Sequence, residues 1–103
     1  MIQGTTPTLH FNLPFQASLI KSAEITLQYT DSFKNVLIVK KLADCELGET
    51  SIATKLTQEE TLQLPAPATA RVQLRILTND DVALATEYYK ISVKKLLKKD
   101  VIE

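Results

Sequence analysis

The fold is decided by one stretch at residues 69 to 93, TARVQLRILTNDDVALATEYYKISV, which reads as two long strands joined by a tight turn. Val72, Leu74 and Ile76 alternate with polar residues, and this period of two is typical of a strand with one buried and one exposed face. Residues 79 to 81, Asn-Asp-Asp, favour a turn, and asparagine readily takes positive φ. We expect the rest of the chain to cover the apolar side of this hairpin.

The second half of the hairpin changes the phase of its apolar residues. They lie at even positions at Val82 and Leu84 and at odd positions from Tyr89 to Val93. The switch predicts either a β-bulge near Glu87 and Tyr88 or a bend by which the strand joins a second sheet.

Length and composition fit one domain. The chain has 103 residues, of which 45% are apolar, and this fraction is sufficient for a hydrophobic core. We expect a single domain over 1–103, with residues 1–6 and 97–103 frayed. Lys+Arg and Asp+Glu both number 12, so the formal net charge is zero. Proteins that bind nucleic acid by neutralising phosphates usually carry a basic excess, so nucleic acid is not an expected partner.

Cysteine content and hydropathy indicate the cellular compartment in which the protein is expected. Cys45 is the one cysteine, which excludes an intrachain disulfide. The N-terminal residues lack the basic and apolar regions of a signal peptide, and no apolar run approaches the ~20 residues that cross a bilayer. We therefore expect a soluble protein of a reducing cytoplasm with no membrane partner.

The remaining segments also read as strands. Pro7 and Pro14 bracket the first of them, which favours a sheet edge. The run Val36 to Val39 is apolar throughout, which implies burial on both faces or an outer side that meets another surface. Thr57 and Glu60 have the spacing of a capping box, which predicts one short helical turn. The strands expected besides the hairpin fall near residues 9–13, 23–30, 36–39, 42–47 and 51–56.

This pattern predicts an all-β fold. Six or seven strands at spacings of about a dozen residues, with one short helical turn, favour a single antiparallel β-sandwich with Ig-like Greek-key connections. A small closed barrel is the alternative.

Candidate chemical groups are few, and each has a simpler structural interpretation. His10 is the one histidine, and it lies on the polar side of the first predicted strand. Cys45 lies between Asp44 and Glu46, which would raise its pKa and weaken it as a nucleophile. One histidine and one cysteine do not make a typical zinc site. We interpret both residues as structural.

The carboxylates likewise favour structural roles. Asp80 and Asp81 lack the spacing of a calcium loop, and Glu59 and Glu60 diverge as neighbours on one helical turn. With two glycines in the chain, a phosphate-binding loop is not expected. We therefore predict no catalytic residue, no cofactor-binding residue and no metal ligand, and a protein that is not an enzyme.

Two surface features remain. Lys94, Lys95, Lys98 and Lys99 form the one basic cluster, which we interpret as a solvated terminal stretch. Leu77 and one side of the Val36 to Val39 run are expected on outer faces. Apolar residues that stay exposed in a small domain often meet another protein.

Several segments carry a resemblance to a known family. They read MIQGTTPTLHFNLPF, SLIKSAEITLQY, ADCEL, KLTQEETLQL and VQLRILTNDDVALATE, in this order. Over nearly its full length the chain resembles a family of small proteins encoded among the virion structural genes of Firmicutes phages and prophages. The Lys-rich C-terminal region differs from the more acidic ending typical of that family.

The resemblance implies a function as well as a setting. It implies a small virion structural or accessory protein, located in the virion or in the host cytoplasm during assembly. We expect a non-enzymatic module for protein–protein interaction whose partners are other virion proteins or further copies of itself, in a homo-oligomer. The alternative is a β-sandwich that binds a carbohydrate or another host-surface ligand.

Overall fold

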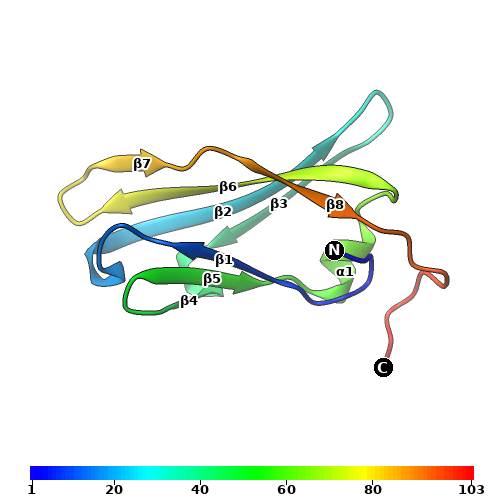
Figure 1. The fold of residues 1–103 in the computed structure, drawn as a ribbon, viewed down its shortest axis with the longest axis horizontal. Coiled ribbons are helices and arrows are strands. Elements are labelled where there is room, and N and C mark those ends of the chain that lie inside the picture. The colour runs from blue at the N-terminus through cyan, green and yellow to red at the C-terminus, as the bar shows by residue number, and fades with distance from the viewer.

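A computed structural model describes the whole chain, from Met1 to Glu103, as two antiparallel sheets packed together (Figure 1). The smaller sheet has the order β1 (Thr8–Asn12), β5 (Ser51–Lys55), β4 (Cys45–Leu47). The larger sheet begins with β3 (Asn35–Lys41), β2 (Ile20–Thr30) and β6 (Ala68–Thr78). Its last two strands, β7 (Ala83–Ala85) and β8 (Tyr89–Val93), both pair with β6. The helical elements are η1 (Ala17–Leu19), η2 (Leu42–Asp44) and α1 (Gln58–Leu62).

The all-β sandwich predicted from the sequence is confirmed. The closed-barrel alternative is wrong, because the two sheets are separate and each has its own edges. The chain passes between the sheets after β1, β3 and β5, as Greek-key connections do. There are eight strands rather than six or seven, because the last predicted strand is interrupted between β7 and β8.

The core lies between the two sheets, and the central strands β2 and β6 supply much of it from the larger sheet. Ile25 is paired with Leu74 and Leu27 with Val72, and none of these side chains is more than 1% exposed. Each such burial contributes roughly 1.5–3 kcal/mol of hydrophobic stabilisation. The alternation of apolar and polar residues in the sequence thus corresponds to one buried face on each of the two longest strands.

The interruption between β7 and β8 is the irregularity that the phase switch predicts. Arg75 is paired with Ala85 and Val72 with Tyr89, so three steps along β6 match four steps on the opposite side. One extra residue is therefore accommodated, as in a β-bulge. β8 stays in the larger sheet, so the alternative in which it joins a second sheet is wrong.

Side-chain and main-chain hydrogen bonds fix the two irregular points of this hairpin. At the bulge, the Thr86 amide donates to the Leu74 carbonyl over 2.9 Å, and the Leu74 amide donates to Thr86 Oγ1 over 3.1 Å. At the turn, Asp81 rather than Asn79 takes the left-handed conformation, with φ 62°. Aspartate tolerates this region better than most residues do.

The N-terminal residues cover the end of β8 at one edge of the larger sheet. Met1 and Gln3 exchange main-chain hydrogen bonds with Lys94 just beyond β8, and Ile2 forms a parallel bridge there. Gln3 is buried, and its side chain donates to the Leu64 carbonyl and accepts from the Leu96 amide. Residues 1–6, for which we expect fraying, thus include three that hold the end of β8.

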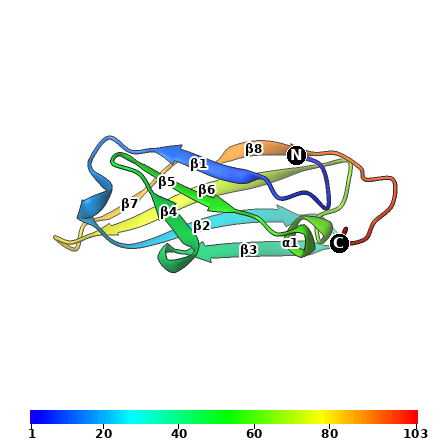
Figure 2. The same ribbon diagram turned by 90° about the horizontal axis from the view of Figure 1, so that it is seen from below.

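The short helix α1 begins with the predicted capping box. The Glu60 amide donates to Thr57 Oγ1 over 3.1 Å, and the Thr57 amide donates to Glu60 Oε1 over 2.8 Å. Figure 2 shows α1 and the C-terminus together at one end of the molecule. β3 runs along the side of the molecule in this view. Neither α1 nor any other helix is long and apolar enough to cross a membrane.

Candidate functional site

The residues singled out from the sequence are spread over the molecule. His10 is exposed on the outer side of β1, which is an edge strand as predicted, and Asp81 lies in the β6–β7 turn with Lys21 at 3.0 Å. Cys45 lies at the start of β4, and Glu60 lies in α1. No group of three His, Cys, Asp or Glu side chains is placed to hold a metal ion. The fold therefore does not bring these groups into one site.

Cys45 is partly covered, and its thiol donates to the Lys41 carbonyl over 3.2 Å. Burial is the main cause that raises its pKa, and the negative charge of Asp44 adds to the rise, although a hydrogen bond with Thr54 opposes it. The sequence predicts the direction from the acidic neighbours, but burial is the larger cause. A raised thiol pKa leaves Cys45 mostly protonated at neutral pH and weakly nucleophilic.

The lysine-rich C-terminal segment lies against α1. The Gln58 side chain donates to the Ile102 carbonyl and accepts from the Ile102 amide, over 3.1 and 2.8 Å. Lys98 forms an exposed ion pair with Asp100, while Leu97 is 99% exposed. These lysines are solvated, as the sequence indicates, and no aromatic side chain is interleaved with them.

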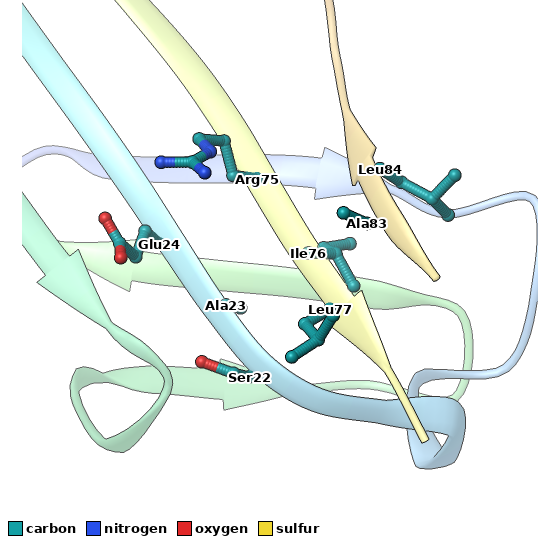
Figure 3. A pocket seen from close by; sticks show the side chains of 8 residues that line it. All are labelled: Ser22, Ala23, Glu24, Arg75, Ile76, Leu77, Ala83 and Leu84. Atoms are coloured by element: carbon teal, nitrogen blue, oxygen red, sulfur yellow. The ribbon is translucent and has the colours of Figure 1, made fainter. Parts of the chain in front are cut away.

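A shallow pocket of about 240 Å³ opens on the outer face of the larger sheet, which is the face turned away from the smaller sheet. Figure 3 shows Arg75 extending from β6 toward β2, on the side of Glu24, with Leu77 lower on the same wall. Small-molecule sites usually enclose roughly 300–1,000 Å³. This pocket is smaller and open, and it holds no paired nucleophile and base.

The outer face also carries exposed apolar side chains on β3. Leu37 is 58% exposed and Val39 is 37% exposed, whereas Val36 and Ile38 are buried in the core. Burial of this run on both faces, one of the two alternatives from the sequence, is therefore wrong within the monomer. β3 is also the end strand of its sheet, so the main-chain groups of Asn35–Lys41 that face away from β2 have no strand beside them, although the Lys41 amide donates to Asp44 Oδ2 over 3.1 Å. We call these main-chain groups the β3 edge.

A cationic group lies on the same outer face, along β6 and β8. Arg71 is paired directly with Lys90 across the two strands, and neither forms an ion pair within the chain. Like charges placed opposite each other destabilise a sheet. The Arg71 guanidinium lies 5.0 Å from the ring centre of Tyr88, which is half exposed. Exposed tyrosine and arginine are typical of the residues that dominate protein interfaces.

The two lysines that end β3 are held by carboxylates of their own chain. Lys40 Nζ lies 2.7 Å from Glu60 Oε1, with both side chains mostly covered, and Lys41 Nζ lies 2.9 Å from Glu24 Oε1. Partial burial raises the pKa of Glu60, but the bonds from Lys40 and Thr57 outweigh it, so the net pKa is lowered. The Lys41 bond also lowers the pKa of Glu24. Both carboxylates are therefore ionised at neutral pH.

The tip of the β2–β3 hairpin presents a fully exposed aromatic ring. Phe33 is 98% exposed, yet the turn that carries it is well ordered by hydrogen bonds. Asp31 Oδ1 accepts from the amides of Phe33 and Lys34 over 2.7 Å each, and its other oxygen accepts from the Tyr29 hydroxyl. This bonding lowers the pKa of Asp31 and raises the pKa of Tyr29.

Sequence reasoning identified the outward side of the Val36 to Val39 run and Leu77, and the structure places both on the outer face, with Leu77 half covered. It missed the pairing of Arg71 with Lys90 and the role of Tyr88 beside them. The sequence did contain the information needed. The predicted bulge determines which side chains of β8 lie on the same face of the sheet as Arg71.

Comparison with known proteins gives no assignment. No protein-family model matches this chain, and a search of curated proteins gives no significant match.

Proposed function

We propose that this chain is a non-enzymatic structural or accessory component of a Firmicutes phage or prophage virion, and that it acts by binding other proteins. The observation that carries the proposal is the β3 edge, with Leu37 and Val39 exposed beside it. An open edge strand offers a row of main-chain donors and acceptors to an incoming strand. The resemblance of the GTTPT, LPF, LIK and LTQEET segments supplies the virion setting.

The rest of the outer face supports the same function. The Arg71 guanidinium lies over the Tyr88 ring, and an acidic group from a partner relieves the charge repulsion between Arg71 and Lys90. An interface of this composition combines an apolar part on β3 with a cationic part on β6 and β8. Such a combination fits a protein surface better than a sugar, because glycan sites generally rely on several exposed aromatic rings.

The proposal is tested by binding to purified virion proteins encoded beside this gene. The wild-type chain is expected to co-elute with at least one of them, or with itself, and Tyr88→Ala with Arg71→Glu is expected to weaken or abolish the contact with another protein. Leu97→Ala is the matched control, because Leu97 is equally apolar and exposed but lies outside the outer face. A strictly monomeric chain that binds none of these proteins contradicts the proposal, and a specific signal on a glycan array would favour the ligand-binding alternative.

A further inference from the structure

We propose that the β3 edge binds the same edge of a second copy of this chain. The two β3 strands run antiparallel about a two-fold axis at Ile38, so that the two five-stranded sheets continue into one another. The inference rests on the proposed function, because it names the partner of the surface described there.

The other edges of the sandwich are closed or too short for this kind of pairing. The end of β8 is covered by Met1 to Gln3, and β7 has three residues followed by the bulge. β4 also has three residues, and β1 lies between Pro7 and Pro14. β3 offers seven residues without proline, glycine or bulge. Proteins usually protect such an edge, and here the one long unprotected edge is also the most apolar.

The lysines that would normally protect this edge are held elsewhere. An exposed lysine on an edge strand keeps other strands away because its charge stays hydrated. Lys40 is instead paired with Glu60 and only 14% of its side chain is exposed, while Lys41 is paired with Glu24 on the outer face. Lys40 is therefore held away from the edge, and Lys41, although 63% exposed, has its charge paired with Glu24 on the outer face.

The sequence of β3 is complementary to itself about Ile38. Rotation about this residue places Leu37 opposite Val39 of the second copy, and Asn35 opposite its Lys41. Lys40 falls opposite Val36 of the second copy, so no lysine faces a lysine. Two Leu37–Val39 pairs then form one apolar patch on the continuous outer face, where each side chain is exposed in the monomer.

The same rotation accounts for the exposed ring at the hairpin tip. Phe33 lies five residues before Ile38, and Ala43 lies five residues after it. The Phe33 ring is thereby carried to the exposed η2 turn of the second copy, next to its Asp44. Lys34 approaches this carboxylate as well, and neither Lys34 nor Asp44 forms an ion pair within its own chain. The order imposed by Asp31 keeps Phe33 in position for this contact.

The experiment measures self-association by sedimentation equilibrium for the full chain and two charge variants. Leu37→Lys combined with Val39→Lys places like charges opposite each other in the proposed register, whereas Leu37→Lys combined with Val39→Glu places opposite charges there. Both positions are exposed on the outer face, so both variants keep the core. Leu97→Lys is the control for added charge away from β3, and circular dichroism confirms folding of every variant.

The expected result is a reversible wild-type dimer of twice the 11.5 kDa chain mass. The like-charge variant dissociates at least tenfold more readily than the opposite-charge variant, and Leu97→Lys matches wild type. Equal dissociation constants for the two charge variants would show that Leu37 does not lie opposite Val39 of the second copy. If the wild-type chain is monomeric at millimolar concentration, the proposal that a second copy binds the β3 edge is wrong. The proposed function is then tested only by binding to the neighbouring virion proteins.

Discussion

The two edges of the larger sheet differ in how many of their main-chain groups are hydrogen-bonded by other parts of the chain. At β8, the N-terminal residues Met1 to Gln3 add main-chain hydrogen bonds, and a buried glutamine side chain fixes them. At β3, seven residues end the sheet with no strand beside them, only Lys41 has main-chain bonds to Asp44 and Cys45, and Leu37 and Val39 are exposed on the outer face. One edge is covered at the end of β8 by the chain itself, and the other has no strand beside it.

This difference shows why exposure alone is a poor guide to an interface. Ile102 and Leu97 are more exposed than Leu37 or Val39, yet they lie in a terminal segment with no open main chain beside them. At β3, apolar side chains, free main-chain groups and neutralised lysines occur together. The combination makes β3 the edge that favours pairing.

The largest effect is expected at the closed edge. Gln3→Ala leaves the Leu64 carbonyl and the Leu96 amide without their partner in a covered position, which should destabilise the fold by about 2–4 kcal/mol. It also releases the residues that cover the end of β8. Urea unfolding measures the loss, and Gln58→Ala, which removes hydrogen bonds to the exposed Ile102, is the control expected to cost less than ~1 kcal/mol. Equal losses in both variants would show that Gln3 does not hold this edge.

The next effect concerns the bulge that divides β7 from β8. Thr86→Val removes the acceptor of the Leu74 amide and should destabilise the fold by about 1–2 kcal/mol. Thr69→Val on the exposed face of β6 is the matched control, because Thr69 forms no side-chain hydrogen bond within the chain. Thermal unfolding of both variants gives the comparison, and a Thr86 variant as stable as the Thr69 variant would mean that the bulge does not depend on this hydroxyl.

A smaller effect is expected where α1 meets β3. Glu60→Gln keeps a side chain suited to the capping box but removes the charge that holds Lys40, so we expect a loss of about 1 kcal/mol at neutral pH. The pKa of Glu60 is lowered in the folded state, so its contribution is fully present above the pKa of the unfolded chain and is lost as the pH falls through the folded pKa.

The gap in unfolding free energy between wild type and Glu60→Gln should therefore close in acid. Chemical unfolding at pH 7 and at pH 3 measures it. A gap that stays constant with pH would exclude the ion pair as its cause.

The smallest change in stability is expected on the outer face. Leu37→Ser should alter the unfolding free energy of the monomer by less than ~0.5 kcal/mol, because the side chain is 58% exposed. It should nevertheless weaken self-association, whereas Leu97→Ser should change neither property. Dilute-solution unfolding and sedimentation separate the two quantities, and a large loss of monomer stability in Leu37→Ser would show that the residue serves the core.

Much of the fold follows from local sequence. The alternation in β2 and β6 marks their buried faces, and the phase switch after Leu84 predicts the bulge, because side chains in a strand alternate strictly between faces. The capping box at Thr57 follows from spacing alone. These features depend on residues close together in the chain.

The properties of the edges could not be predicted in the same way. Whether Val36 to Val39 lies inside a sheet or at its border depends on strand order, which pairs β2 with the distant β6. The role of Gln3 depends on Leu64 and Leu96, more than sixty residues away. Long-range pairing of this kind leaves no periodic signal in the local sequence.

The central claim, that β3 is left open to receive a strand, is tested most directly by amide hydrogen exchange at micromolar and millimolar protein concentration. Apart from Lys41, whose amide donates to Asp44, the amides of β3 that face away from β2 should exchange quickly in dilute solution and slowly at high concentration, while those of β8 keep the same rate at both. Rates along β3 that do not change with concentration, or a change confined to β8, would contradict the claim.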